Sequence, residues 1–107
     1  MIYVISPFWH EDADVREKRR AINISYADML IKRGEMVFSP LKYSEKNINS
    51  NSASSESYWL DFDIEIMRGC DTAHVLQIDG WKESKGVANE IDWAKKNNME
   101  IKYITHV

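Results

Sequence analysis

Four short apolar runs, separated by segments of helical periodicity, constrain the fold of this chain more than any other feature of its sequence. The runs are IYVIS (2–6), MVFSPL (36–41), AHVLQI (73–78) and EIKYI (100–104). Because they are apolar almost throughout, they predict strands that are buried on both faces of a sheet. The order β-α-β-α-β-α-β therefore predicts an α/β three-layer sandwich, with helices on both faces of a parallel sheet of four to five strands.

Capping residues predict where the helices begin and end. The first helix is expected to start at Asp12 or Asp14 and to run to about Arg33, where Gly34 terminates it. Further helices are expected at 58–69 and 84–97. Residues 42–57 are rich in Ser, Asn, Lys and Glu and have no period, which predicts a mobile surface loop of the kind that closes over a ligand.

Composition limits the classes of partner. The chain has 14 basic and 17 acidic residues, interspersed, and a net charge of −3, so it presents no broad positive field to a nucleic-acid polymer or an anionic membrane. A small molecule is the expected partner. The single cysteine, Cys70, allows neither an intramolecular disulfide nor a zinc cluster, so we expect no metal or cofactor and a cytoplasmic location. The 107 residues suffice for one domain.

The ligand of a flavodoxin- or Rossmann-like sheet binds beyond the carboxyl ends of the strands, where the connecting loops meet. Three segments therefore have the best placement for function: Ser6 to Trp9, Ser39 to Tyr43, and Asp79 to Gly86. Arg19 falls on the core-facing side of the first helix, near its start. It is expected either to reach an anion in this cleft or to pair with a loop carboxylate.

One carboxylate in the helix predicted at 58–69 lies on its apolar side. On a helical wheel, Asp63 falls within the arc of Phe62 and Ile66, whereas Asp61 and Glu65 point away. Burial of an unpaired carboxylate costs several kcal/mol. Asp63 therefore either caps a neighbouring loop or has a chemical role.

A second carboxylate flanks the apolar stripe of the last helix. Glu90 lies beside the arc of Val87, Ile91 and Ala94. It is either a salt-bridged flank residue or a second functional group. Because the helices that carry Asp63 and Glu90 flank the third strand, the two carboxylates are expected to meet at its carboxyl end.

Two carboxylates in one cleft are the equipment for cleaving a glycosidic bond, since one attacks the anomeric carbon and the other assists the leaving group. Ser84 and Gly86 lie six and four positions before Glu90, at the start of the same helix. A hydroxyl and free backbone N–H groups at a helix N-terminus suit an anion such as phosphate. Sugar phosphate chemistry is therefore one interpretation of this pattern.

These residues resemble those of the nucleoside 2-deoxyribosyltransferase superfamily. The likeness is to its small nucleoside 5′-monophosphate N-glycosidase branch and to an uncharacterised small relative, marked by VRE at 15–17, FSP at 38–40 and DGWKES at 79–84. The resemblance implies a catalytic set of a first-strand tyrosine, an aspartate and a helix glutamate, which match Tyr3, Asp63 and Glu90. By that resemblance Glu90 is the nucleophile, Tyr3 orients it and Asp63 assists departure of the base.

The resemblance also implies the substrate-binding residues. In the superfamily a serine six positions before the nucleophile accompanies a 5′-phosphate and an aspartate accompanies a free 5′-hydroxyl, and this chain has Ser84. Gly86 would let the backbone approach the phosphate. Ser6 and Phe8, in the first loop, complete the predicted set, and either Phe8 or Trp9 stacks on the base or only packs.

The sequence thus predicts cleavage of the N-glycosidic bond of a (deoxy)nucleoside 5′-monophosphate through a covalent glycosyl-glutamate, with water as the acceptor. Two alternatives remain: a deoxyribosyltransferase that exchanges bases, and a non-catalytic nucleotide-binding or sensing module. The resemblance further implies a homodimer or a higher homo-oligomer, because the family completes its sites from a neighbouring subunit.

Overall fold

A parallel four-stranded sheet forms the centre of the protein. The computed structural model describes residues 1–44 and 56–107. The strands are β1 (Ile2–Ile5), β2 (Val37–Phe38), β3 (Thr72–Leu76) and β4 (Glu100–Ile104), in the order β2-β1-β3-β4. Every neighbouring pair is parallel. The predicted α/β class and the parallel sheet are therefore confirmed.

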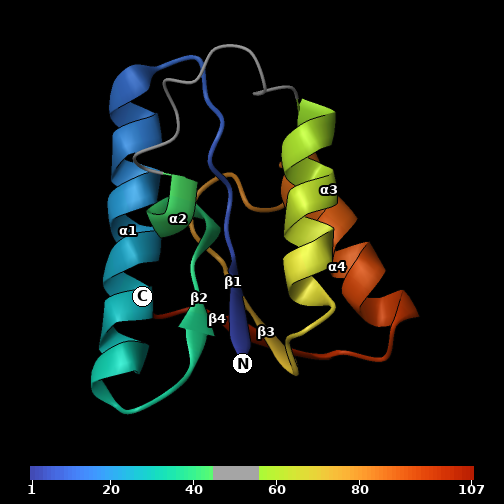
Figure 1. Ribbon diagram of the computed structural model, residues 1–107. Helices are drawn as coiled ribbons and strands as arrows, with labels where there is room; N and C mark the ends of the chain where they lie inside the picture. The colour runs from blue at the N-terminus through green and yellow to red at the C-terminus, as the bar shows by residue number, and fades with distance from the viewer. Residues whose placement is uncertain (45–55) are drawn as a thin grey trace.

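Helices cover both faces of this sheet and make three layers (Figure 1). The long helix α1 (Ala13–Lys32) packs on one face, and α3 (Glu56–Met67) and α4 (Lys85–Lys96) pack side by side on the other. Within the ranges given above, no helix has both the length and the apolar character that a membrane span needs.

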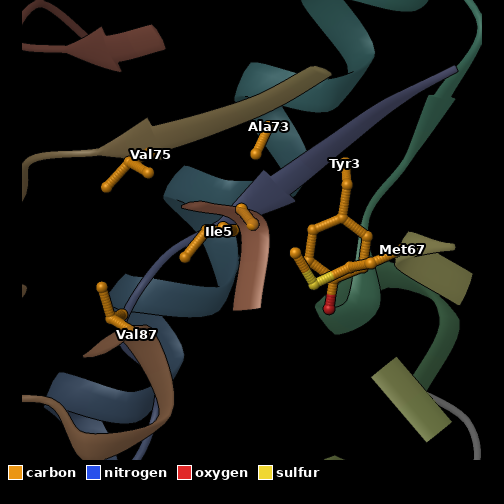
Figure 2. Close-up of a cluster of buried hydrophobic side chains, with 7 residues drawn as sticks. Tyr3, Ile5, Met67, Ala73, Val75 and Val87 are labelled. Atoms are coloured by element: carbon orange, nitrogen blue, oxygen red, sulfur yellow. The ribbon is translucent and has the colours of Figure 1, made fainter. Parts of the chain in front are cut away.

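The side chains of β1 alternate between the two layers, as the pleat of a strand requires. Tyr3 and Ile5 point towards α3 and α4, where they pack with Met67, Ala73 and Val87 (Figure 2). The residue between them points towards α1 and joins a second buried cluster. Each face of the sheet therefore has its own core, and the phenol of Tyr3 lies on the face that α3 and α4 cover.

Helix ends lie where the capping residues predict them. Asp12, rather than Asp14, caps α1, and its side chain accepts a hydrogen bond from the Asp14 backbone N–H at 2.8 Å. Gly34 follows α1 with a φ of 87°, a left-handed conformation that favours glycine. Ser84 caps α4, and its hydroxyl accepts from the backbone N–H of Val87 at 3.2 Å.

The prediction of a second strand at 36–41 is confirmed only for its first part and is wrong after Phe38. Only Val37–Phe38 is a strand, and the helix α2 (Pro40–Ser44) begins where the sequence suggested continued strand and then loop. Ser39 starts this helix because its hydroxyl accepts from the backbone N–H of Lys42 at 3.1 Å, and proline is well suited to a first helical position. The loop predicted at 42–57 is thus helical at 42–44 and 56–57, and its remainder lies outside the described residues.

The chain leaves the two central strands in opposite directions. After β1 it passes to α1 on one face, whereas after β3 it passes to α4 on the other face. This divergence is the switch point at which open parallel sheets bind their ligands. The loops 6–12 and 77–84 meet there, at the carboxyl ends of β1 and β3.

Candidate functional site

A buried hydrogen bond joins the first strand to the last helix. The hydroxyl of Tyr3 donates to Oε2 of Glu90 at 2.6 Å. Tyr3 is fully buried, and Glu90 is only 8% exposed. No cation pairs with Glu90 among the salt bridges of the described part of the chain. The structure therefore contradicts the interpretation of Glu90 as a salt-bridged residue beside the apolar stripe of its helix.

Asp63 is the third member of this group. It comes from α3, which packs beside α4 on the same face of the sheet, and it is half-buried. Its carboxyl group lies close enough to Tyr3 and Glu90 to raise the pKa of both. The structure thus brings together, from β1, α3 and α4, the three side chains that the family resemblance implies as a catalytic set.

Burial shifts the ionisation of both carboxyl groups. Desolvation, followed by repulsion from Asp63, raises the pKa of Glu90 from 4.5 to about 8. Desolvation also raises the pKa of Asp63 from 3.8 to about 6, against the opposing effect of the neighbouring Glu90 and Tyr3. The pKa of the Tyr3 phenol rises, because of burial first and then the charge of Glu90. Between about pH 6 and pH 8 the carboxyl pair consequently holds one proton.

The N-terminus of α4 lies one and a half turns before Glu90. With a rise of 1.5 Å per residue, the six positions from Ser84 to Glu90 correspond to about 9 Å along the helix. Ser84 is half-buried, and Lys85 and Gly86 are exposed. The Ser84 hydroxyl caps the backbone N–H of Val87, which leaves the N–H groups of Lys85 and Gly86 without a partner inside the described structure.

The N-terminus of α1 also lies at the carboxyl ends of the strands, but it carries its own negative charge. Asp12 caps it, Asp14 lies in its first turn, and Glu11 precedes the cap. These carboxylates would repel an anion. Of the helices α1 and α4, α4 is thus the one suited to an anionic group.

Ser6, a predicted substrate-binding residue, is already engaged with the scaffold. Its hydroxyl accepts a hydrogen bond from Nδ2 of Asn23 at 2.6 Å, and Oδ1 of Asn23 accepts from the hydroxyl of Ser39 at 2.5 Å. Asn23 is 1% exposed. This chain of bonds ties the end of β1 to the start of α2, so Ser6 has a structural role beside any contact with substrate.

Phe8, the other predicted first-loop residue, lies under an arginine. The guanidinium of Arg20 stacks on the Phe8 ring at 4.7 Å, and Arg20 also donates to the backbone oxygen of Leu41 at 2.7 Å. Trp9 is 73% exposed and carries Arg16 over its ring at 4.9 Å. One face of each first-loop ring is therefore covered by a cation from α1.

The sequence interpretation missed a series of aromatic rings beside the carboxylates. Phe38 stacks near Tyr3 with ring centres 6.1 Å apart, and Tyr43 lies 5.8 Å from Phe38 and 5.0 Å from Phe62. The series thus runs from β1 through β2 and α2 to the residue next to Asp63. The helical spacing of aromatic residues at 58, 59 and 62 was the available signal.

Two surface hollows lie away from this group. One follows the outer side of α1, and the other lies beside the ends of α3 and α4 near Cys70. Neither includes Tyr3, Asp63 or Glu90. Because Asp63 is more exposed than its two partners, a ligand would approach the group from the side of Asp63.

No metal centre is apparent in the part of the chain that the structure describes: it contains no group of three or more His, Cys, Asp or Glu side chains placed to hold an ion. His74 is satisfied internally, because its Nδ1 lies 2.7 Å from the hydroxyl of Tyr26 in the core beneath α1. His10 accepts a hydrogen bond from the backbone N–H of Asp12 at 3.0 Å.

Comparison with protein families places nearly the whole chain in one of them. A family model described as "Domain of unknown function (DUF1937)" matches residues 1–105. The chain belongs to this family. No curated protein matched the sequence. The match includes every residue of the carboxylate group and both loops at the switch point, so the candidate site lies within the family's domain.

Proposed function

We propose that this DUF1937 protein cleaves the N-glycosidic bond of a (deoxy)nucleoside 5′-monophosphate and releases the free base. The observation that carries the proposal is the buried contact between the Tyr3 hydroxyl and the Glu90 carboxyl group, with Asp63 beside both. Asp63 lies close enough to Glu90 to raise its pKa, and a short separation of the two carboxyl groups favours a covalent mechanism over one in which a water lies between widely separated carboxylates.

The first step in this mechanism forms a glycosyl-enzyme. In the state with one proton, burial holds that proton on Glu90, so the proton first passes to Asp63, which leaves Glu90 ionised and Asp63 protonated. An oxygen of Glu90 attacks C1′, the bond from C1′ to the base nitrogen breaks, and the Asp63 proton passes to the base. The hydrogen bond from Tyr3 lowers the pKa of Glu90, so it stabilises the attacking carboxylate against the effect of burial.

The second step returns the enzyme to its starting state. Asp63, now ionised, takes a proton from a water molecule that attacks C1′. The ester bond to Glu90 breaks, the glutamate leaves as a carboxylate, and the pentose 5-phosphate is free. A second base in place of water would give the transferase reaction instead.

The start of α4 supports a phosphate on the substrate. Ser84 and the free backbone N–H groups of Lys85 and Gly86 would bind the phosphate oxygens. Glu90 lies further along the same helix, so one rigid element would hold both ends of the sugar phosphate. A fixed distance between the phosphate site and the nucleophile is what orientation of a reactant requires.

A panel of deoxynucleoside and ribonucleoside 5′-monophosphates, with release of free base as the readout, tests the proposal. We expect release by the wild type and a loss of at least about a thousandfold in Glu90→Gln. Intact-mass measurement should detect a pentose phosphate on the wild type and none on the variant. The matched control is Glu35→Gln, because Glu35 is exposed and lies at the amino ends of the strands, away from the site.

Other outcomes point to the alternatives. Exchange of one base for another, without net hydrolysis, would replace the hydrolase by the transferase. Binding of nucleotides without release, equal in the wild type and in Glu90→Gln, would favour a sensing module and contradict catalysis. The homodimer stays a prediction, which sedimentation measurements can check.

A further inference from the structure

Arg19 joins the two loops that diverge at the switch point. Its Nη1 donates to the backbone oxygen of Trp9 at 2.7 Å and lies 3.5 Å from that of Phe8. Its Nη2 donates to the backbone oxygen of Asp79 at 3.2 Å. Arg19 thus neither points to a free anion nor pairs with a carboxylate, which were the two expectations from the sequence; it bonds to carbonyl groups of loops 70 residues apart.

A glycine makes room for this arginine. Gly80 has a φ of 89°, and a Cβ built on it would lie 2.3 Å from Nη2 of Arg19. Gly34 has nearly the same φ, 87°, but a Cβ there would meet nothing within 4 Å. Both positions favour glycine for their backbone conformation, but only Gly80 also needs it for the approach of a side chain.

The contact continues into the first turn of α4. The backbone oxygen of Gly80 accepts from the N–H of Ser84 at 3.1 Å. The Ser84 hydroxyl and carbonyl in turn accept from the N–H groups of Val87 and Ala88 at 3.2 and 3.0 Å. Arg19 is therefore linked to the helix that carries Glu90 by its hydrogen bond to the Asp79 carbonyl, by the peptide bond from Asp79 to Gly80, and by the hydrogen bond between the Gly80 carbonyl and Ser84.

We propose that Arg19 is a positioning residue that fixes the N-terminus of α4 against the first loop and thereby sets the preference for a phosphate-bearing substrate. Arg19 contacts neither carboxylate, so it acts through the placement of Ser84 and of the N–H groups that follow it. The preference for a phosphate-bearing substrate rests on the proposed function. The positioning of α4 by Arg19 does not depend on it.

Amide hydrogen exchange at Ser84, Val87 and Ala88, whose N–H groups are hydrogen-bonded, tests the placement without any substrate. In Arg19→Ala and in Gly80→Ala we expect exchange to be about tenfold faster, because either change separates the guanidinium from the loop. Two matched controls should leave exchange unchanged. Arg16→Ala removes a neighbouring arginine that bonds only to carbonyls of its own loop, and Gly34→Ala reproduces the backbone strain without the clash.

A double variant separates the clash from simple destabilisation. In the Arg19→Ala background, Gly80→Ala should accelerate exchange less than it does in the wild type, since the clash with the guanidinium is absent and only the backbone strain remains. If Arg19→Ala does not fold, as judged by circular dichroism, Arg19→Lys replaces it, because a single ammonium nitrogen cannot bridge both loops. Unchanged exchange in Arg19→Ala, or equal acceleration in Arg16→Ala, would overturn the inference.

Kinetics then test the substrate preference. For Arg19→Ala we expect KM for a deoxynucleoside 5′-monophosphate to rise at least tenfold with little change in kcat, and the matching deoxynucleoside to be nearly unaffected. Equal losses for both substrates would overturn the link to phosphate. If the wild type cleaves neither compound, the proposed function fails, and the exchange measurement alone decides whether Arg19 positions α4.

Discussion

Replacing Glu90 by glutamine should make the protein more stable at high pH while abolishing its proposed activity. Glutamine has the shape of a protonated glutamate, so it can still accept the hydrogen bond from Tyr3. It cannot ionise, and therefore it never becomes a buried charge beside Asp63. Stabilisation on loss of a functional group is common at active sites, where burial and like charges are maintained for chemistry.

The size of the effect follows from the raised pKa. Unfolded, Glu90 ionises near 4.5, whereas the folded protein holds its proton until about pH 8. Between these values the folded state binds more protons than the unfolded state, so the free energy of unfolding falls as pH rises. A rise of the pKa from 4.5 to about 8 corresponds to about 5 kcal/mol. Structural relaxation and water penetration reduce the expected gain at pH 9 to about 2–4 kcal/mol.

Urea denaturation followed by circular dichroism, from pH 4 to pH 9, measures this difference. At pH 4 the wild type and Glu90→Gln should have similar free energies of unfolding, because the glutamate is protonated in both states. The variant should become progressively more stable than the wild type up to about pH 8, and the difference should then stay constant. Glu83→Gln, an exposed control, should follow the wild type throughout.

Two results would refute the reasoning. If Glu90→Gln were less stable than the wild type at pH 9, the ionised Glu90 carboxylate would be stabilised by its surroundings in the folded protein. Its pKa would then not be raised. If the difference between the two proteins did not grow between pH 5 and pH 8, the pKa of Glu90 would not be raised at all. In either case the shared proton, and the mechanism built on it, would have to be abandoned.

Three further predictions follow from the same contacts. The pH profile of kcat/KM for base release should be bell-shaped, with limbs near pH 6 and pH 8. Protonation of both Asp63 and Glu90 removes the nucleophile, and ionisation of both removes the acid. A profile with one limb would contradict the shared proton. Tyr3→Phe should lower kcat about 10- to 100-fold and move the basic limb to higher pH. In the wild type the hydrogen bond from Tyr3 lowers the pKa of Glu90, so its loss raises that pKa. An unmoved basic limb would contradict this. Asn23→Ala should reduce the free energy of unfolding by about 2 kcal/mol, because the buried Ser39 hydroxyl loses its acceptor and the half-buried Ser6 hydroxyl loses its donor. The exposed Asn89→Ala should change it by less than about 0.5 kcal/mol in urea denaturation; equal effects would show that the Asn23 network is not stabilising.

The extent of α1 was predicted from its sequence, but the burial of two of its polar residues was not. Arg20 and Asn23 are buried on the side of the helix that faces the sheet and α2. Polar residues there weaken the apolar periodicity by which a helix face is recognised. Their burial is tolerated because Arg20 donates to the carbonyl of Leu41, and Asn23 bonds to two serine hydroxyls. These partners lie in segments that only the folded chain brings together.

The amino-acid sequence by itself determined the layers, the parallel sheet, most of the helix ends and the unusual positions of Asp63 and Glu90. Apolar period, capping residues and chain order are local properties, so each can be recognised without knowledge of distant contacts. Only the tertiary structure decided what these carboxyl groups meet and how Arg19 joins two loops. Hydrogen-bond partners and desolvation depend on residues far apart in the chain, which is why the raised pKa of Glu90 and the need for glycine at Gly80 became visible only once the chain was folded.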